Sequence, residues 1–136
     1  MLGWLLGRKN RNETQIASIT NGPGTYSVDV VGESNYQSAL EEICGGHTEQ
    51  GHRYEIEANL VLEDDNPHDS NAVMVSIEGE TVGYLDRSTA RSFRIALKAV
   101  APRGAIAKCP AIIVGGWDRG GGDRGHFGVK LDLPIA

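Results

Sequence analysis

The chain has 136 residues, of which 40% are hydrophobic and 23% charged, a length and composition typical of one globular domain with its own core. Its net charge of −5 argues against binding nucleic acid through overall positive charge alone. The apolar run near the N-terminus is far shorter than the roughly 20 residues of a membrane span. Basic residues follow that run, whereas a signal peptide places them before it. Cys44 and Cys109 lie far apart in the sequence and indicate free thiols, so we predict a cytoplasmic protein without a transmembrane segment.

The charge is unevenly distributed along the sequence. Residues 1–79 hold 4 Lys/Arg and 13 Asp/Glu, a net charge of −9, while residues 80–136 hold 9 Lys/Arg and 5 Asp/Glu, a net charge of +4. Together these give the −5 of the whole chain. The asymmetry predicts a basic face on an acidic protein, unless the two parts interleave in the fold.

The first part of the chain reads as a tail followed by a strand and a helix. We predict that residues 1–25 are an apolar N-terminal tip and a polar linker, with the linker at 12–25. The alternating stretch 26–32 predicts a strand. A short helix should follow, capped by Ser34 and ended by Gly45.

The remaining elements are mostly strands. The patterns predict strands over 53–63 and 71–77, the second joined by a tight turn at Glu78-Gly79 to a strand that reaches Leu85. A helix is expected over 89–99, with Ser88 as its N-cap. The last two strands are expected within 105–117 and 126–134, joined by the glycine-rich stretch 117–127. Six short strands with tight connections predict a mainly β (α+β) protein, a small six-stranded antiparallel barrel with two short helices, over residues 26–136.

The sequence EDDNPHDSNAVMV at 63–75 holds the densest cluster of polar residues. One interpretation is a metal-dependent hydrolase that uses Asp65, His68 and Asp69, although the spacing matches neither a zinc nor a calcium motif. A second interpretation is a cross-linked turn, because Asn66 precedes a proline and Asp69 can accept backbone N–H groups. In such a turn His68 has no evident structural role and is available to a ligand.

Three motifs in this region resemble the HIRAN domain family. They are Val30-Val31-Gly32, then NPHDSNAVMV at 66–75, then TVGYLDR at 81–87 followed by Ala90. The resemblance extends over residues 28–133. It implies an OB-like barrel that binds single-stranded DNA, in the best understood members at a free 3′ end.

The resemblance also implies which residues form the binding site. The turn residues Asn66, His68 and Asp69 would hold the terminal nucleotide, with Asp69 accepting a hydrogen bond from a 3′-hydroxyl. Tyr84 and Arg87 would contact base and phosphate. Tyr36 corresponds roughly to an aromatic of the first loop in the family, and Phe127 or Trp117 to an aromatic late in the fold. Two positions depart from helicase-fused members: Glu33-Ser34-Asn35 replace a basic residue and an aromatic, and His68 replaces a tyrosine.

Two further stretches carry positive charge. Arg87, Arg91, Arg94 and Lys98 lie on one face of the predicted helix, where they could neutralise phosphates or form an ordinary solvated face. The glycine-rich stretch holds Arg119 and Arg124 between two aromatics; it is either a nucleic-acid contact or a plain hairpin with Asp–Arg pairs.

We therefore predict a non-catalytic module that binds nucleic acid, with single-stranded DNA or a DNA 3′ end as partner and no cofactor or metal. The predicted contacts are Tyr36, Asn66, His68, Asp69, Tyr84, Arg87, Arg91, Arg94, Trp117, Arg119, Arg124 and Phe127. Two alternatives remain open. One is a module that binds a protein or peptide, with a protein partner at the N-terminal tip, and the other is the metal-dependent hydrolase.

Overall fold

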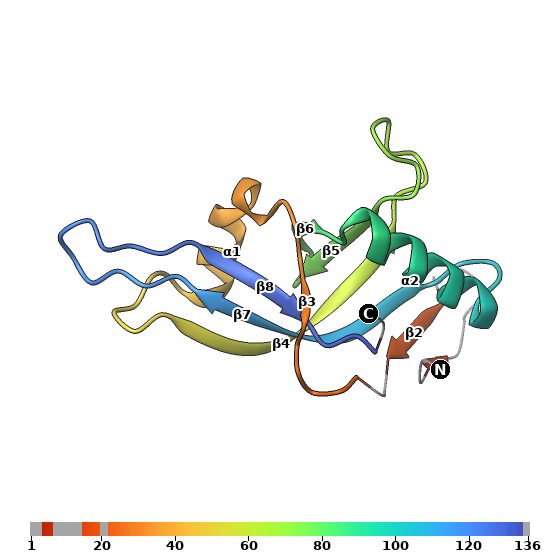
Figure 1. The fold of residues 1–136 in the computed structure, drawn as a ribbon, viewed down its shortest axis with the longest axis horizontal. Helices are drawn as coiled ribbons and strands as arrows, with labels where there is room; N and C mark the ends of the chain where they lie inside the picture. Colours follow the sequence, from red (N-terminus) through yellow and green to blue (C-terminus); the bar gives the residue numbers. More distant parts are fainter. Residues whose placement is uncertain (1–3, 7–14, 20–21, 135–136) are drawn as a thin grey trace.

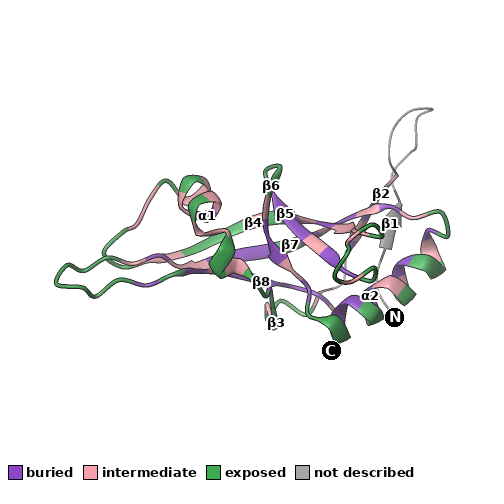
Figure 2. Cartoon of the chain, turned by 90° about the horizontal axis from the view of Figure 1, so that it is seen from above, coloured by how far each residue is buried: buried purple, intermediate pink, exposed green. Residues whose placement is uncertain are grey.

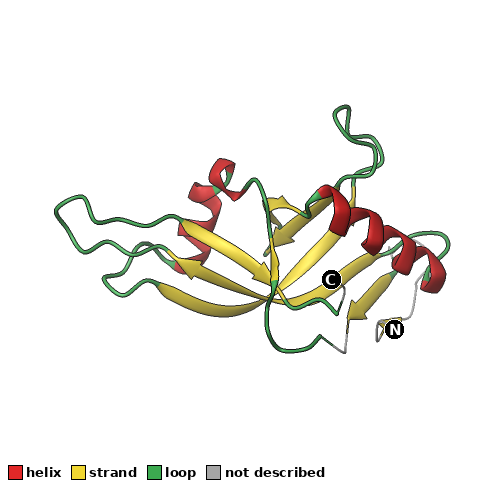
Figure 3. Cartoon of the chain, viewed as in Figure 1, coloured by secondary structure: helices red, strands yellow, loops and turns green. Residues whose placement is uncertain are grey.

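The computed structural model describes residues 4–6, 15–19 and 22–134. Within them the strands are β1 (Trp4–Leu6), β2 (Ile16–Ile19), β3 (Val28–Asp29), β4 (His52–Leu62), β5 (Val73–Ile77), β6 (Glu80–Tyr84), β7 (Ile106–Gly115) and β8 (Phe127–Leu131). The helices are a 3₁₀ turn η1 (Glu33–Asn35), α1 (Gln37–Cys44) and α2 (Arg87–Val100). Figure 3 shows both α-helices beside the sheet.

The strands form one curled sheet (Figure 1). Its order is β1-β2-β7-β4-β5-β6, and β8 pairs with both β7 and β3. The two edges meet where Val31, just after β3, forms a bridge with Tyr84 at the end of β6, with N–H···O distances of 2.8 and 2.9 Å. The fold is therefore a mainly β, OB-like half-barrel with two helices, as the sequence predicted.

The core lies inside the curl of the sheet. Alternate residues of the strands point into it, among them Leu60, Val75 and Val82, all fully buried. Helix α2 adds a stripe of buried residues that includes Phe93 and Leu97. Figure 2 shows buried residues along the inner strands and on one side of α2. Burying one such side chain fully stabilises the fold by about 2 kcal/mol, which fixes α2 against the sheet.

Two parts of the fold prediction are wrong. The described residues contain eight strands rather than six, and one strand pair is parallel: β2 pairs with residues 106–108 of β7. Strand β2 lies within the predicted linker 12–25. It was missed because four residues in a polar stretch carry little pattern, although Ala17 and Ile19 alternate with more exposed neighbours and are buried.

Part of the N-terminal tip also joins the sheet. The backbone of β1 pairs with β2 in antiparallel fashion. Residues 1–3, 7–14 and 20–21 of the predicted tail lie outside the described residues, and the division into regions 1–25 and 26–136 stays a prediction. None of the helices in the described part of the chain has the length and apolar character to cross a membrane.

Both helices begin at residues other than those predicted. Ser34 lies in η1, and the N-cap of α1 is Tyr36. The N-cap of α2 is Asp86 instead of Ser88: its Oδ1 accepts a hydrogen bond from the backbone N–H of Thr89 at 2.8 Å. Its Oδ2 accepts another from the Thr89 hydroxyl at 3.0 Å. The backbone hydrogen bond is the main cause that lowers the pKa of Asp86.

Replacing Asp86 by alanine should lower the free energy of unfolding by about 1 kcal/mol at neutral pH, because α2 loses its cap. The pKa of this carboxyl is lower in the folded than in the unfolded chain, so its contribution is present above its usual value of 3.8. It is lost as the pH falls through the folded-state value. Urea unfolding of both proteins from neutral pH to about pH 3 should therefore show converging stabilities. A difference that stays constant over this range would contradict the assignment.

Candidate nucleic-acid interface

The turn between β4 and β5 is built around the side chain of Asn66. Its Oδ1 accepts the backbone N–H groups of His68 at 2.8 Å and Asp69 at 3.2 Å, and its Nδ2 donates to Glu63 at 3.1 Å. Asp69 then accepts the backbone N–H of Asn71 at 2.9 Å. The turn is thus cross-linked as predicted. Most of the hydrogen-bonding capacity of Asn66 is used inside the turn, and one amide hydrogen remains for a ligand.

A cavity of about 370 Å³ opens where this turn meets the end of β6 and the start of α2. It is lined by Val31, Asn66, His68, Asp69, Ala72, Tyr84, Leu85, Asp86 and Arg87. Five of these are predicted site residues, and they come from two segments on either side of the β5–β6 hairpin. The fold brings these five to one cavity, directly beside the bridge that joins the two sheet edges.

Tyr84 lines the cavity and also lies close to Glu63 and Tyr36, which do not line it. Burial, followed by a hydrogen bond to Glu63 and the charge of that carboxylate, raises the pKa of the Tyr84 phenol far above its usual value. The carboxylate of Glu63 close to the Tyr84 phenol thus favours its neutral form. Tyr36 also interacts with the Tyr84 side chain but does not line the cavity. Its place is beside Tyr84 rather than in direct contact with the cavity.

Asp69 and Arg87 provide opposite charges at the cavity. Asp69 Oδ1 is used by the Asn71 N–H, whereas its Oδ2 lies 3.9 Å from Arg87 Nε, beyond hydrogen-bond distance. The Arg87 side chain is 78% exposed and stands in the first turn of α2. A carboxylate oxygen and a guanidinium group are thus both available, as acceptor and as donor, to one small ligand.

Further along α2, Arg94 has a structural role. Its Nε and Nη2 donate to the backbone oxygens of Asn71 at 2.7 Å and Ala72 at 2.9 Å, and its Nη1 pairs with Asp64 at 2.8 Å. Its side chain is only 19% exposed. Arg94 therefore braces the turn against α2 and is not presented to phosphates, contrary to the prediction. Arg91 is exposed on the same helix.

The loop at residues 117–127 lies far from this cavity. In Figure 1 it projects at the end of β7 and β8, away from the turn between β4 and β5. Arg119 pairs with Asp123 at 3.5 Å and lies over the Trp117 ring, and Arg124 lies 3.7 Å from Asp118. The interpretation as a hairpin with Asp–Arg pairs therefore describes the loop better.

The two aromatic residues of this loop are also occupied by the fold. Phe127 is 2% exposed, and its ring lies 4.9 Å from that of His47 and 5.4 Å from that of His52. Trp117 donates to Asp123 at 3.0 Å, and its ring packs against Gly125 so closely that a Cβ there would lie 2.5 Å from it. The structure thus does not place Phe127 where a base could stack on it.

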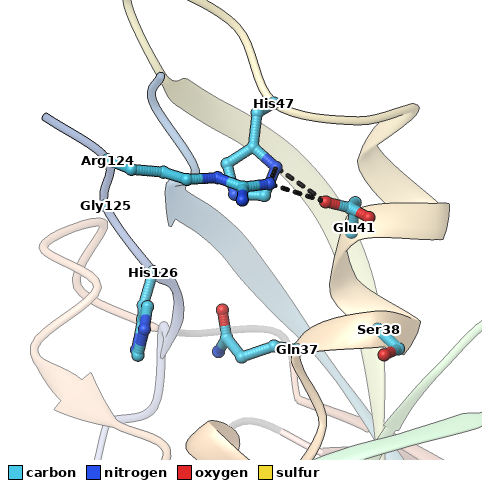
Figure 4. Close-up of a pocket in the computed structure, with 7 residues that line it drawn as sticks. All are labelled: Gln37, Ser38, Glu41, His47, Arg124, Gly125 and His126. Carbon is cyan, nitrogen blue, oxygen red and sulfur yellow. Dashed lines mark hydrogen bonds and ion pairs between the residues drawn. The ribbon is translucent and has the colours of Figure 1, made fainter. Parts of the chain in front are cut away.

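A second polar cavity, of about 320 Å³, lies between α1 and this loop (Figure 4). Glu41 lines this cavity from α1 and pairs with His47 at 2.7 Å and Arg124 at 3.5 Å. The Glu41 carboxylate thus offsets the charge of Arg124 in this cavity.

Metal binding finds little support in the geometry. Among residues 4–6, 15–19 and 22–134, no three His, Cys, Asp or Glu side chains lie together in a group that could hold a metal ion. Cys109 is buried in the core, and burial raises the pKa of its thiol to about 12. The hydrolase alternative thus has no ligand set in the described part of the chain.

Two residues of the cavity region were not singled out from the sequence. Glu63 accepts a hydrogen bond from Asn66 and lies close to the Tyr84 phenol. Asp86 both caps α2 and lines the cavity. Asp86 could have been found, because aspartate is one of the preferred residues at a helix N-cap. The contact between Glu63 and Tyr84 joins the end of β4 to the end of β6, and no pattern in the sequence near Glu63 indicates it.

The fold and the cavity together define a small β-barrel binding module. The HIRAN domain model matches residues 23–101, more than half of the chain, and the chain belongs to this family. The match covers every residue that lines the first cavity and ends at α2, whereas the resemblance noted in the sequence extended to residue 133. Neither the curated proteins nor the solved structures contain a significant match to the chain.

Proposed function

We propose that this protein binds the 3′ end of single-stranded DNA, with the terminal nucleotide in the cavity beside the turn between β4 and β5. HIRAN domains are known for binding nucleic acid, and on their own they are binding modules. The observation that carries the proposal is the convergence of Asp69, Tyr84 and Arg87 on one open cavity. The proposal includes no catalytic step.

Each side chain has a distinct role in this proposal. The free Oδ2 of Asp69 accepts a hydrogen bond from the terminal 3′-hydroxyl. The exposed guanidinium of Arg87 pairs with the phosphate that links the last two nucleotides. His68 is exposed, and within the described residues its ring makes no hydrogen bond or ion pair, so it can stack on the terminal base.

We expect a modest affinity that depends only weakly on salt. Few cations are free at the site, since Arg94 is held by the fold and the chain carries a net charge of −5. Neutralising one or two phosphates gives a shallow salt dependence in place of the steep one of a basic protein. Glu33, at a position that is basic in helicase-fused members, is consistent with this expectation.

Fluorescence anisotropy with oligonucleotides labelled at the 5′ end tests the proposal. A 3′-phosphate cannot donate as a hydroxyl does, and it adds between one and two negative charges close to Asp69. We therefore expect binding at least about tenfold weaker than for the 3′-hydroxyl oligonucleotide. Adding a 5′-phosphate to an internally labelled oligonucleotide should change little. Equal affinity for both 3′ ends would contradict end recognition, and no binding of either would contradict the DNA proposal.

Two further predictions stay proposals with their own support. A protein partner at the N-terminal tip is suggested by its apolar sequence, residues 1–6. A cytoplasmic location is suggested by Cys44 and Cys109, which are both free thiols.

A further inference from the structure

The first half of β4 forms an open sheet edge. Strand β4 pairs with β7 over residues 52–60, but β5 pairs only with residues 59–62. Among the described residues, no strand pairs with the other side of residues 52–58. We call residues 52–58 the β4 edge. Such an edge leaves backbone N–H and C=O groups free to pair with another strand.

The register identifies which groups point outward. Glu57 lies opposite Pro110, which has no N–H and whose carbonyl oxygen accepts from the Asp132 N–H at 3.0 Å, so the two do not form a hydrogen-bonded pair. Because pairs alternate in an antiparallel ladder, the even-numbered residues of β4 bond to β7 and the odd-numbered ones face away. The backbone N–H of Glu63, further along, bonds to Ala72 on the β5 side, which agrees with this assignment. The outward groups thus belong to Arg53, Glu55 and Glu57.

The edge is accessible. The side chains of Arg53 and Glu55, which pair with each other at 3.2 Å within one copy, are 61% and 67% exposed. Tyr54 is 42% exposed, one of the few large hydrophobic residues at the surface among the described residues. Helix α1 packs over the sheet against β6 and β8. Figure 1 shows the first half of β4 along the outer border of the sheet.

We propose that the β4 edge pairs with the same edge of a second copy of this chain, antiparallel about a two-fold axis at Tyr54. This inference does not depend on DNA binding. In this register Arg53 of each copy lies opposite Glu55 of the other, so the interface contains two opposite-charge pairs. The two Tyr54 side chains meet in a non-hydrogen-bonded pair, where cross-strand side chains are closest.

Neighbouring registers are less favourable. The outward backbone N–H and C=O groups of both strands face each other only when the two-fold axis passes through a residue, and not when it passes between two residues. An axis at Glu55 pairs Arg53 with Glu57 but places two glutamates directly opposite each other, and an axis at Arg53 places two arginines opposite each other. Glu57 is already paired with Lys108 at 3.5 Å and faces no charged residue when the axis passes through Tyr54. Of these three registers, only the one with its axis at Tyr54 places no like charges opposite each other.

Sedimentation equilibrium of charge-reversed variants tests the proposal. The wild-type chain should dimerise reversibly, and Arg53→Glu or Glu55→Arg should each weaken dimerisation about tenfold or more, because both symmetric pairs become repulsive. The double variant R53E/E55R restores opposite charges and should return to within about threefold of wild type. Glu57→Arg is the matched control: it should leave dimerisation unchanged, whereas an axis at Glu55 would make it disruptive.

Circular dichroism should show that all four variants keep the fold, since the changed side chains are exposed. A wild-type chain that sediments as a monomer from micromolar to millimolar concentration would overturn the proposal. So would a double variant that is no better than the single variants, because the pairing of Arg53 with Glu55 across the axis would then be absent.

Discussion

Replacing Gly83 by alanine should destabilise the fold by about 3 kcal/mol or more, a large part of the stability of a small domain. Gly83 has φ +152°, a conformation that side chains rarely adopt. A Cβ there would lie 2.4 Å from Val30 Cγ1 and 2.6 Å from the Val31 carbonyl oxygen. Neither neighbour can move freely, because Val30 is buried and Val31 forms the bridge to Tyr84.

Urea unfolding measures this effect, and Gly79 supplies a matched control. Gly79 lies in the tight turn before β6 with φ +81°, and a Cβ there would have no atom within 4 Å. Its replacement by alanine adds only backbone strain and should cost about 1 kcal/mol. If both variants lose the same stability, the close approach at Gly83 has no energetic role.

The consequence of this close approach extends to the cavity. Gly83 lets the segment after β3 come close enough to β6 for Val31 to bond with Tyr84, and both of these residues line the cavity. The contact that joins the two sheet edges therefore also forms part of the candidate site. A Gly83 variant that still folds should therefore also bind DNA more weakly.

The sequence was informative about the two turns that local hydrogen bonds and turn residues determine. The hairpin at 71–85 was predicted from alternation and from Glu78-Gly79, and both turn residues have positive φ, as this kind of turn requires. The cross-linked turn was predicted because Asn66 and Asp69 bond within three residues of themselves. Such contacts depend on short stretches of chain, which a single sequence displays.

Contacts between distant segments were predicted less well. Arg94 has the spacing of a basic helix face, yet the carbonyl groups of Asn71 and Ala72 lie within its reach and hold it. Phe127 stands in a glycine-rich stretch that reads as exposed, but the histidines beside it come from the loop between α1 and β4 and from the start of β4. Helical spacing and loop composition say nothing about what a different part of the chain places opposite a residue.

Asp69 uses one carboxylate oxygen within the turn and leaves the other available to a ligand, which allows a sharp test of the binding site. Asp69→Asn should lower the affinity for a 3′-hydroxyl oligonucleotide about thirtyfold, because a hydrogen bond to a charged group contributes about 2 kcal/mol. The asparagine Oδ1 can still accept the Asn71 N–H and so preserve the turn. Its amide nitrogen then stands where Asp69 offers a second oxygen, and it cannot accept from the terminal hydroxyl.

Anisotropy titrations of this variant with both oligonucleotides separate hydrogen bonding from charge. Removing a negative charge should leave the affinity for the 3′-phosphate oligonucleotide unchanged or slightly higher, so the preference for the hydroxyl end should disappear. Asp65→Asn makes the same chemical change in the same turn, at an exposed residue that does not line the cavity. It should preserve the preference. If the two variants behave alike, Asp69 acts only through the charge of the turn, and the terminal hydroxyl binds elsewhere.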